Sequence, residues 1–453
     1  MKTMMFYLPE NRRIGNRRAL NEGVRDIARH GFESILLQIR DTAFQMDDPP
    51  VIRSVELVTR EAHRLGLKLV LGFVTTNCRP WSTSFFKRHP EEGDFYARRA
   101  EGEIRAGRLT ASTPCAGSIN SDDIVRVAAA FRSTTRGIVR LRSFAATFTA
   151  ERQTWLDDTT DWHCAPENTV RVTGTVRGQA DGPVVLYVTF RVSEPDYESP
   201  RVSRYLDRLL EKYRHIPLDG VAWDEPGFHG VSSVGGWNRY KVSVPFLRRF
   251  QKENGYDLCD RLPWLDEDQG AESRRVRHDY FRSLNQALFD AQSRFVAKSR
   301  RLFGKDLFSG IHHTWAGEAC VNDVFVGCSD YFELARNLSG GFTDGAFSFE
   351  KSMCYTLRLA VSIGKHHPAG VGYSNSWDYD PTAVKLAHFT RLMAIWKLGW
   401  IGHAYGQSPG GGPGYPLNET WPAMGEAARR VQLAGQFLGA ARERVRLAIY
   451  HSW

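Results

Sequence analysis

Short apolar runs alternate with stretches of helical periodicity along most of this chain, and this alternation limits the possible folds more than any other feature. The first three runs are Met4–Pro9, Phe32–Asp41 and Leu67–Asn77. The segments between them carry apolar residues at helical spacing and stop at Gly31 and Gly66, where a helix typically ends. Continuously apolar strands separated by helices predict a parallel sheet that helices cover on both faces.

The alternation resumes near residue 197 and brings the number of strand–helix units to eight. The later strands are predicted at Leu218–Pro226, Asp306–Trp315, Ser339–Gly345, Ala369–Asp380 and Trp400–Gly406. The longest helix is predicted at about Glu272 to Leu302. Eight units in order are the count of an α/β (β/α)8 TIM barrel. An open, doubly wound sheet is the alternative, but no Gly-rich phosphate-binding turn follows any predicted strand.

A long interval between the third and fourth strands divides the chain. Residues 78 to about 135 are polar and are predicted to be irregular, so 1–135 would form the first part of the barrel with a long loop. The Val- and Thr-rich segments Val170–Gly178 and Gly182–Val192 predict a hairpin within a small β-rich insertion at 136–196. Residues 197–443 would complete the barrel. Residues 444–453 resemble a ninth strand, which predicts the start of a truncated C-terminal domain.

Charge and cysteine usage exclude several classes of function. The 453-residue chain has 60 basic and 51 acidic side chains, but the basic ones are scattered, which argues against a nucleic-acid partner. The seven cysteines show no spacing typical of a disulfide framework or a zinc site. We find no signal-peptide pattern at the N-terminus and no apolar run of the roughly 20 residues that span a bilayer. The sequence therefore predicts a cytoplasmic protein with no membrane partner, no metal and no cofactor.

The ends of the predicted strands carry acidic, aromatic and hydrogen-bonding residues. In a barrel the active site forms at the C-terminal ends of the strands, so these residues would gather at one mouth. The candidates are Tyr7, Arg40, Asp224, Glu225, His312, His313, Trp315, Glu318, Asp344, Asn375, Trp377, Asp378, His403 and Tyr405. Paired carboxylates suit glycoside hydrolysis, and the aromatic, imidazole and amide groups suit the binding of a sugar.

Among the acids, Glu225 is predicted to be the general acid, with its pKa raised by burial or by the adjacent Asp224. Glu318, Asp344 or Asp378 would supply the second carboxylate. The other candidates would line the sugar site. Neighbouring side chains on a strand point apart, so only one of Asp224 and Glu225 needs to face the sugar. Other readings remain open, because Asp224 could serve the turn before Pro226 and the two histidines could pack in the core or bind a metal.

Four segments in order resemble the α-L-rhamnosidase-like enzymes of glycoside hydrolase family 106. They are "GVAWDEPGF", "FLRRFQKENGYDLCDRLPWL", "RVRHDYFRSLNQALFDAQSRFV" and "GIHHTWAGE", which together cover about Leu218 to Glu318. The resemblance implies a barrel glycosidase in which Glu225 and Glu318 are the catalytic carboxylates. One departure concerns the larger clan of retaining barrel hydrolases, which has a Glu on strand seven where this chain has "SNSWDYD".

The leading hypothesis is therefore a glycoside hydrolase that cleaves a glycosidic bond in an oligosaccharide or glycoside. The missing Glu on strand seven motivates a second hypothesis, a barrel that binds carbohydrate without catalysis. A third is a sugar-acid isomerase or a metal-dependent lyase on the same fold.

Overall fold

The computed structural model describes the chain in several ranges, which contain two sheets and most of the predicted helices. These ranges are 3–9, 11–39, 44–74, 85, 88–115, 124–134, 137–141, 145–151, 168–224, 239–268, 270–312, 331–346, 357–358, 360–366, 373–377, 398–405 and 417–438. The predicted ninth strand at 444–453 lies outside them.

Eight parallel strands form a ring in which neighbours follow chain order. They are β1 (Thr3–Tyr7), β2 (Ser34–Gln38), β3 (Lys68–Val74), β11 (Gly220–Asp224), β13 (Phe308–His312), β14 (Gly340–Ala346), β15 (Tyr373–Trp377) and β16 (Gly399–Tyr405). The ring closes because β1 pairs with both β2 and β16. Each strand overlaps one of the eight predicted runs, so the prediction of an α/β fold built on a parallel sheet is confirmed.

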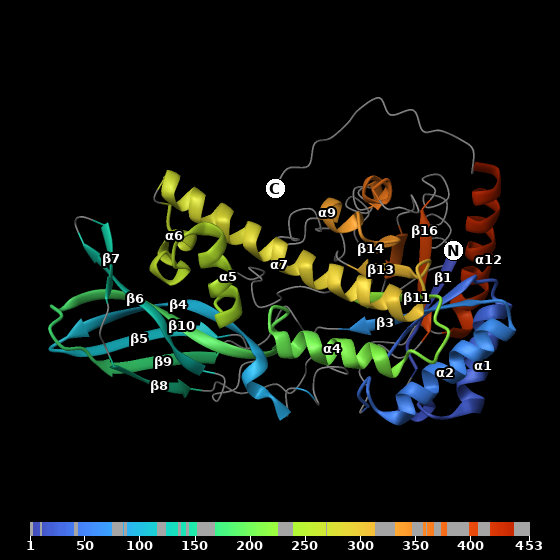
Figure 1. Cartoon of the computed structure of the whole chain (residues 1–453), viewed down its shortest axis with the longest axis horizontal. Coiled ribbons are helices and arrows are strands. Elements are labelled where there is room, and N and C mark those ends of the chain that lie inside the picture. Colours follow the sequence, from blue (N-terminus) through green and yellow to red (C-terminus); the bar gives the residue numbers. More distant parts are fainter. Residues whose placement is uncertain are drawn as a thin grey trace.

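Helices cover the outside of the ring. They are α1 (Arg17–Arg29), α2 (Pro49–Arg64), α4 (Pro200–Lys212), α7 (Ala271–Phe303) and α12 (Leu417–Leu438). Asn16 caps α1 by accepting a hydrogen bond from the backbone N–H of Ala19 at 3.2 Å, and α2 begins at Pro49, whose fixed φ suits a first turn. Figure 1 shows α4 and α7 side by side along one flank of the ring, and these two helices are in contact.

The two faces of the strands belong to different cores. One cluster contains Met4, Phe6, Leu8, Leu36, Val70, Ala222, Phe308, Tyr373 and Ile401, which come from seven strands or their ends and from no helix, so it fills the barrel interior. The alternate residues, among them Met5, Ile35, Leu71 and Trp223, pack in a larger cluster with α1, α2, α4, α7 and α12. This alternation shows which strand positions belong to the interior.

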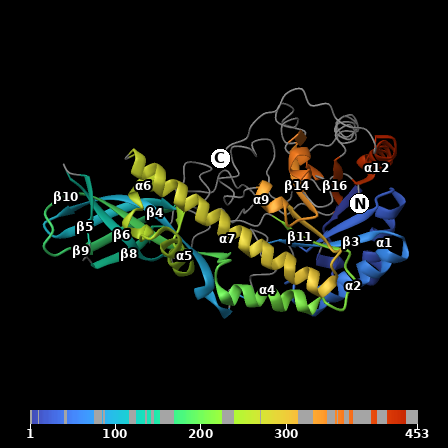
Figure 2. The ribbon, with the colours of Figure 1, turned by 45° about the horizontal axis from the view of Figure 1, so that its top comes forward.

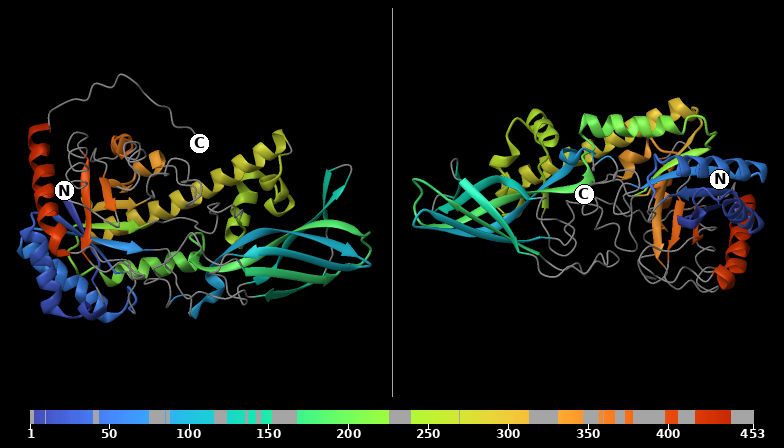
Figure 3. Two further views of the ribbon diagram at one scale, coloured as in Figure 1. Left: turned by 180° about the vertical axis from the view of Figure 1, so that it is seen from behind. Right: turned by 90° about the horizontal axis from the view of Figure 1, so that it is seen from below.

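A second, antiparallel sheet lies between β3 and α4 in the chain, apart from its short last strand, which follows β11. Its strands are β4 (Gly93–Arg105), β5 (Arg108–Cys115), β6 (Ile124–Thr134), β7 (Gly137–Leu141), β8 (Ala145–Glu151), β9 (Asn168–Thr175), β10 (Gly182–Pro195) and β12 (Arg239–Lys241). They pair in the order β7-β6-β10-β4-β5-β9-β8, and β12 pairs with β4. Figures 1, 2 and 3 show this sheet and the ring at opposite ends of the molecule.

The predicted irregularity of residues 78–135 is wrong, because strand structure already begins at Gly93. β4 alternates small or apolar residues, such as Ala100 and Ile104, with charged ones, so it lacks the Val- and Thr-rich composition that predicted the later strands. The predicted hairpin of β9 and β10 is also wrong. The two strands follow each other in the chain but are separated in the sheet by β4 and β5, which pair with them instead.

Short helices and the first half of α7 connect the two sheets. The short helices are α5 (Val244–Asn254), η5 (Leu258–Asp260) and α6 (Pro263–Asp266). Asp266 accepts hydrogen bonds from the hydroxyl groups of Tyr187 and Tyr240, both at 2.5 Å, and Arg99 donates to Glu267 at 2.8 Å. The sheet is thereby fixed to the same helical layer that packs against the barrel.

Candidate active site

The C-terminal ends of the eight parallel strands meet at one rim of the ring, where barrel enzymes assemble their active sites. The described candidates in the C-terminal half of their strands are Tyr7, Asp224, His312, Asp344, Asn375, Trp377, His403 and Tyr405. The predicted residues Arg40, Glu225, His313, Trp315, Glu318 and Asp378 lie outside the described residues. The rim therefore holds two of the predicted carboxylate residues, Asp224 and Asp344, within strands.

Strand register places acidic residues beside hydrogen-bonding residues. Asp224 is paired with His312 across β11 and β13, and Asp344 is paired with Asn375 across β14 and β15. Since β13 lies between β11 and β14, both pairs belong to one continuous arc of the rim. The register therefore puts each of the two acidic residues next to a histidine or an asparagine on the neighbouring strand, and these are residue types that transfer protons and bind hydroxyl groups.

The strand alternation relates these positions to the barrel interior. Asp224 follows the interior residue Ala222 by two positions, and Asn375 and Trp377 follow the interior residue Tyr373 by two and four positions. His312 is four positions after Phe308, which is also in the interior cluster. In β16 the register shifts between Gly402 and Tyr405, so the alternation is interrupted before that strand ends.

Tyr7 lies elsewhere than the sequence predicts. It is fully buried and belongs to the cluster between the ring and the helices, while its neighbours Phe6 and Leu8 belong to the interior cluster. This position argues against a contact between Tyr7 and a sugar. Alternation along the strand is the reason, because Tyr7 is offset by one residue from the interior positions.

Gln38 is a rim residue at the end of the second predicted strand that was not among the predicted sugar-site residues. It is the last residue of β2, and its side chain is only 1% exposed. It lies two positions after the interior residue Leu36, and its side-chain Oε1 has no hydrogen-bond partner within the described part of the chain. The signal was present in the sequence, because a glutamine stands between the apolar residues Ile35–Leu37 and Ile39.

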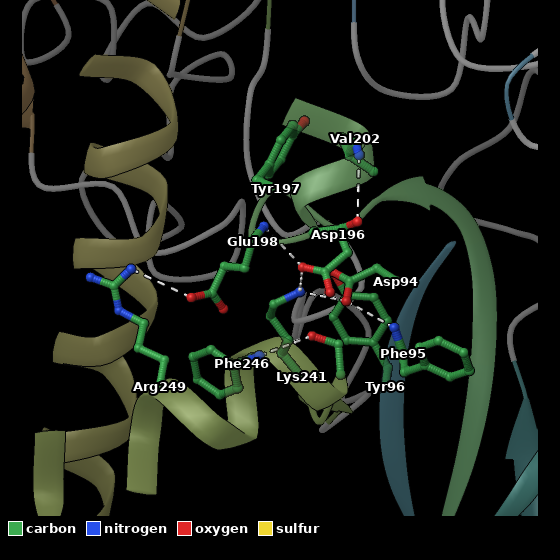
Figure 4. A network of polar contacts seen from close by, with 12 residues as sticks. Asp94, Phe95, Tyr96, Asp196, Tyr197, Glu198, Val202, Lys241, Phe246 and Arg249 are labelled. Carbon is green, nitrogen blue, oxygen red and sulfur yellow. Dashed lines mark hydrogen bonds and ion pairs between the residues drawn. The ribbon is translucent and has the colours of Figure 1, made fainter. Parts of the chain in front are cut away.

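A second group of charged residues is buried away from the rim, between the antiparallel sheet and the helices (Figure 4). Lys241 in β12 is fully buried and contacts Asp94 at the start of β4 and Asp196 before α4, the latter at 3.0 Å. Burial raises the pKa of Asp94 to about 7 even though Lys241 opposes this shift. Burial likewise raises the pKa of the nearby Glu198, which bonds to Arg249, to about 7.

This cluster has the properties of a structural connection. Asp94 also accepts a hydrogen bond from the Tyr96 hydroxyl at 2.8 Å, and Arg249 continues the network to Asp290 in α7 at 2.6 Å. Each charge thus has partners within the protein, and the cluster lies where strands and helices join. Within the described residues, no group of three or more His, Cys, Asp or Glu side chains could hold a metal ion. Every described helix is too short or too polar to cross a lipid bilayer.

Comparison with known proteins identifies the fold. Neither a protein-family model nor a curated protein matches the sequence. A rhamnosidase from Novosphingobium sp. PP1Y is similar with a TM-score of 0.54 and 12% identity, over 96% of this chain and 59% of that one. The catalytic domain of a β-amylase from Paenibacillus polymyxa is similar with a TM-score of 0.52 and 8% identity, over 96% and 98%. The chain therefore has a fold of the glycoside hydrolase type and spans about three fifths of that rhamnosidase.

Proposed function

We propose that this protein is a glycoside hydrolase that acts at the rim of a complete (β/α)8 barrel. One observation carries the proposal. Strand register brings Asp224 beside His312 and Asp344 beside Asn375, on one arc of the rim where barrel enzymes bind their substrates. The fold shared with a β-amylase domain and a rhamnosidase supports it.

Two carboxyl groups are the minimum machinery for breaking a glycosidic bond. One protonates the leaving oxygen, and the other attacks the anomeric carbon or activates a water molecule. We infer that Asp224 and Asp344 form this pair, because Asp224 holds an interior position on β11 and Asp344 lies two strands away on β14. Glu225, the general acid that the sequence predicts, lies outside the described residues and is the alternative to Asp224.

The fold and the rim composition support a sugar as the substrate. Asn375, Trp377 and His312 supply the hydrogen bonds and the flat apolar ring that sugars require. The segments that resemble α-L-rhamnosidases, together with the similar fold of a rhamnosidase, make α-L-rhamnosides the first substrates to test. Glu318 and Asp378 remain alternative carboxylates in this proposal, and the cytoplasmic location remains a prediction.

The test is hydrolysis of a panel of 4-nitrophenyl glycosides that includes α-L-rhamnoside, β-D-glucoside and β-D-mannoside. We expect at least one glycoside to be cleaved, and we expect Asp224→Asn to lower kcat by at least about 100-fold. Asp219→Asn is the matched control, because Asp219 precedes the same strand at the opposite end of the barrel and bonds to the backbone N–H of Leu69 at 2.8 Å. Wild-type turnover in Asp224→Asn would exclude this role for the residue.

A carbohydrate-binding barrel without catalysis is a second candidate, favoured by one observation. β15, with the sequence Tyr-Ser-Asn-Ser-Trp, contains no carboxylate. Calorimetry with oligosaccharides distinguishes the two functions, since binding without release of product over days supports the second. Activity on sugar acids that a chelator abolishes and a divalent ion restores would instead indicate the isomerase or lyase.

A further inference from the structure

Gln38 combines three properties that a core residue of a strand rarely has together. It is polar, it is 1% exposed, and its Oε1 accepts no hydrogen bond from the described residues. A buried polar atom without a partner reduces the stability of a fold, and a leucine at this interior position would avoid that cost. Unsatisfied groups of this kind in native proteins call for a functional explanation.

Gly72 provides the space for the Gln38 side chain. The two residues are register partners on β2 and β3. A Cβ atom on Gly72 would lie 2.4 Å from Gln38 Cγ and 3.1 Å from its Nε2, so any larger residue at position 72 would displace the glutamine. The side chain of Gln38 therefore lies over Gly72 of β3, in the space that a side chain at position 72 would occupy.

The positions that continue this row around the ring are also small. Gly72 pairs with Ala222, Ala222 with Gly310, and Gly310 with Gly340. The next row toward the rim contains Asp224 and His312, which lie two residues beyond Ala222 and Gly310. Successive rows on one face are roughly 7 Å apart along the strands. Gln38 thus lies one row beneath the proposed catalytic arc, beside residues whose side chains are a hydrogen atom or a methyl group.

We propose that Gln38 is a substrate-binding residue that forms part of the floor of the sugar site. Its Oε1 accepts a hydrogen bond from a hydroxyl group of the sugar ring that faces the barrel interior on the side of β2. The substrate is then a glycoside with a free hydroxyl at that ring position. This inference rests on the proposed function and adds a specificity residue to it.

The test pairs a change in the protein with a change in the sugar. The probes are the 4-nitrophenyl glycoside that the wild-type protein cleaves fastest and its monodeoxy analogues, each lacking one hydroxyl. We expect Gln38→Met to lower kcat/KM for the parent glycoside by about 10- to 100-fold, the usual effect of removing one buried hydrogen bond. For the single analogue that lacks the partner hydroxyl, we expect the kcat/KM values of Gln38→Met and the wild type to differ by less than about twofold.

Stability provides an independent readout. Because the substitution removes an unsatisfied buried amide, Gln38→Met should melt at the same temperature as the wild type or higher. The matched control is Gln292→Met on α7, the same substitution at another buried glutamine outside the barrel interior. This variant should have the wild-type kcat/KM for the parent glycoside and for each monodeoxy analogue. Gln38→Leu replaces Gln38→Met if the latter does not fold. The proposal would be overturned if Gln38→Met lowered kcat/KM equally for every analogue, or did not lower kcat/KM for the parent glycoside.

A failure of the proposed function has a different signature. If the wild type cleaves no glycoside, the same comparison is made by calorimetry with the free sugars and their deoxy forms. In that case the lack of cleavage refutes the hydrolase function, whereas sugar binding that depends on Gln38 and on one hydroxyl supports the role of Gln38. Sugar binding that is unchanged in Gln38→Met, or no binding to any sugar in the wild type, would refute the role of Gln38.

Discussion

Lys241 is fully buried, and its ammonium group lies between carboxylates from two segments that are distant in the chain. Asp94 begins the antiparallel sheet, Asp196 precedes α4, and Lys241 lies in the short strand β12. The sequence gives little sign of this, because "NRYKVS" resembles an ordinary surface segment and the partners are 147 and 45 residues away. The sequence marks Asp224 more plainly, because this residue ends the apolar run "GVAW".

Replacing Lys241 tests how much this connection stabilises the fold. Lys241→Met leaves Asp94 and Asp196 buried without their cation, so we expect the free energy of unfolding to fall by about 3 kcal/mol. Urea denaturation measures the change. Lys212→Met is the control, because Lys212 is 46% exposed in its pair with Asp47, and loss of such a pair costs less than about 1 kcal/mol. Similar losses in both variants would show that the buried cluster does not stabilise the protein.

The same cluster makes stability depend on pH. The pKa values of Asp94 and Glu198 rise to about 7 from ordinary values of 3.8 and 4.5, mainly because of burial. At pH values between the ordinary and the raised pKa values, the folded state holds more protons than the unfolded state, so the free energy of unfolding falls as pH rises. Lys241 and Arg249 face the two acids, and because the pKa of each is raised, both stay positively charged across this range.

We therefore expect the free energy of unfolding to be lower at pH 8 than at pH 5.5, by roughly 1–3 kcal/mol. Urea denaturation at several pH values between these limits measures this slope. Asp94→Asn, which cannot ionise, should have a flatter profile than the wild type. A wild-type stability that rises across this range would contradict the assignment.

At the scale of elements, the eight barrel strands could be predicted and most of the second sheet could not. Strands such as β3 are buried on both faces and are therefore continuously apolar, which is a strong signal in a single sequence. Strand β4 has one face exposed in part and carries Arg and Glu along its length, so its signal is weak. The pairing of β10 with β4 instead of β9 depends on contacts distant in sequence, which local patterns do not contain.

The positions of β11 and β14 predict the stereochemistry of hydrolysis. With β13 between them, the strands of Asp224 and Asp344 lie two spacings apart, roughly 10 Å around the ring. Phe342 is in register with Asp224 through His312, so Asp344 is two residues, roughly 7 Å, further along. Together these offsets put the two Cα atoms roughly 12 Å apart. We therefore expect carboxyl groups further apart than the about 5–5.5 Å of retaining enzymes, which favours the about 6.5–9.5 Å of inverting enzymes, with a water molecule between them.

We expect the first product to have the anomeric configuration opposite to that of the substrate. Proton NMR during the first minutes of hydrolysis, before the anomers equilibrate, shows which form appears. A product with retained configuration would require carboxyl groups about 5–5.5 Å apart and would exclude this pair.

At the scale of the whole molecule, α7 connects the barrel to the antiparallel sheet. This helix spans 33 residues, and Figure 2 shows it extending from the sheet end to the ring. One hydrophobic cluster contains Phe131 and Tyr187 of the sheet together with Phe73 and Phe295 beside the ring. The two sheets therefore share a core, and we expect them to unfold together.

Hydrogen exchange at increasing urea concentration tests this expectation. Backbone amides of β4 and β10 should lose protection at the same urea concentration as those of β1, β2 and β3. Earlier loss of protection in β4 and β10 alone would indicate that the sheet is a separate folding unit.

The central claim is that Asp224 and Asp344 act together on a glycosidic bond, and the kcat values of single and double variants test it most directly. On the glycoside that the wild type cleaves fastest, Asp224→Asn and Asp344→Asn should each lower kcat by at least about 100-fold. The double variant should lose less than about tenfold more than the slower single variant, because two groups in one step are not additive. Either single variant retaining the kcat of the Asp219→Asn control would contradict the claim.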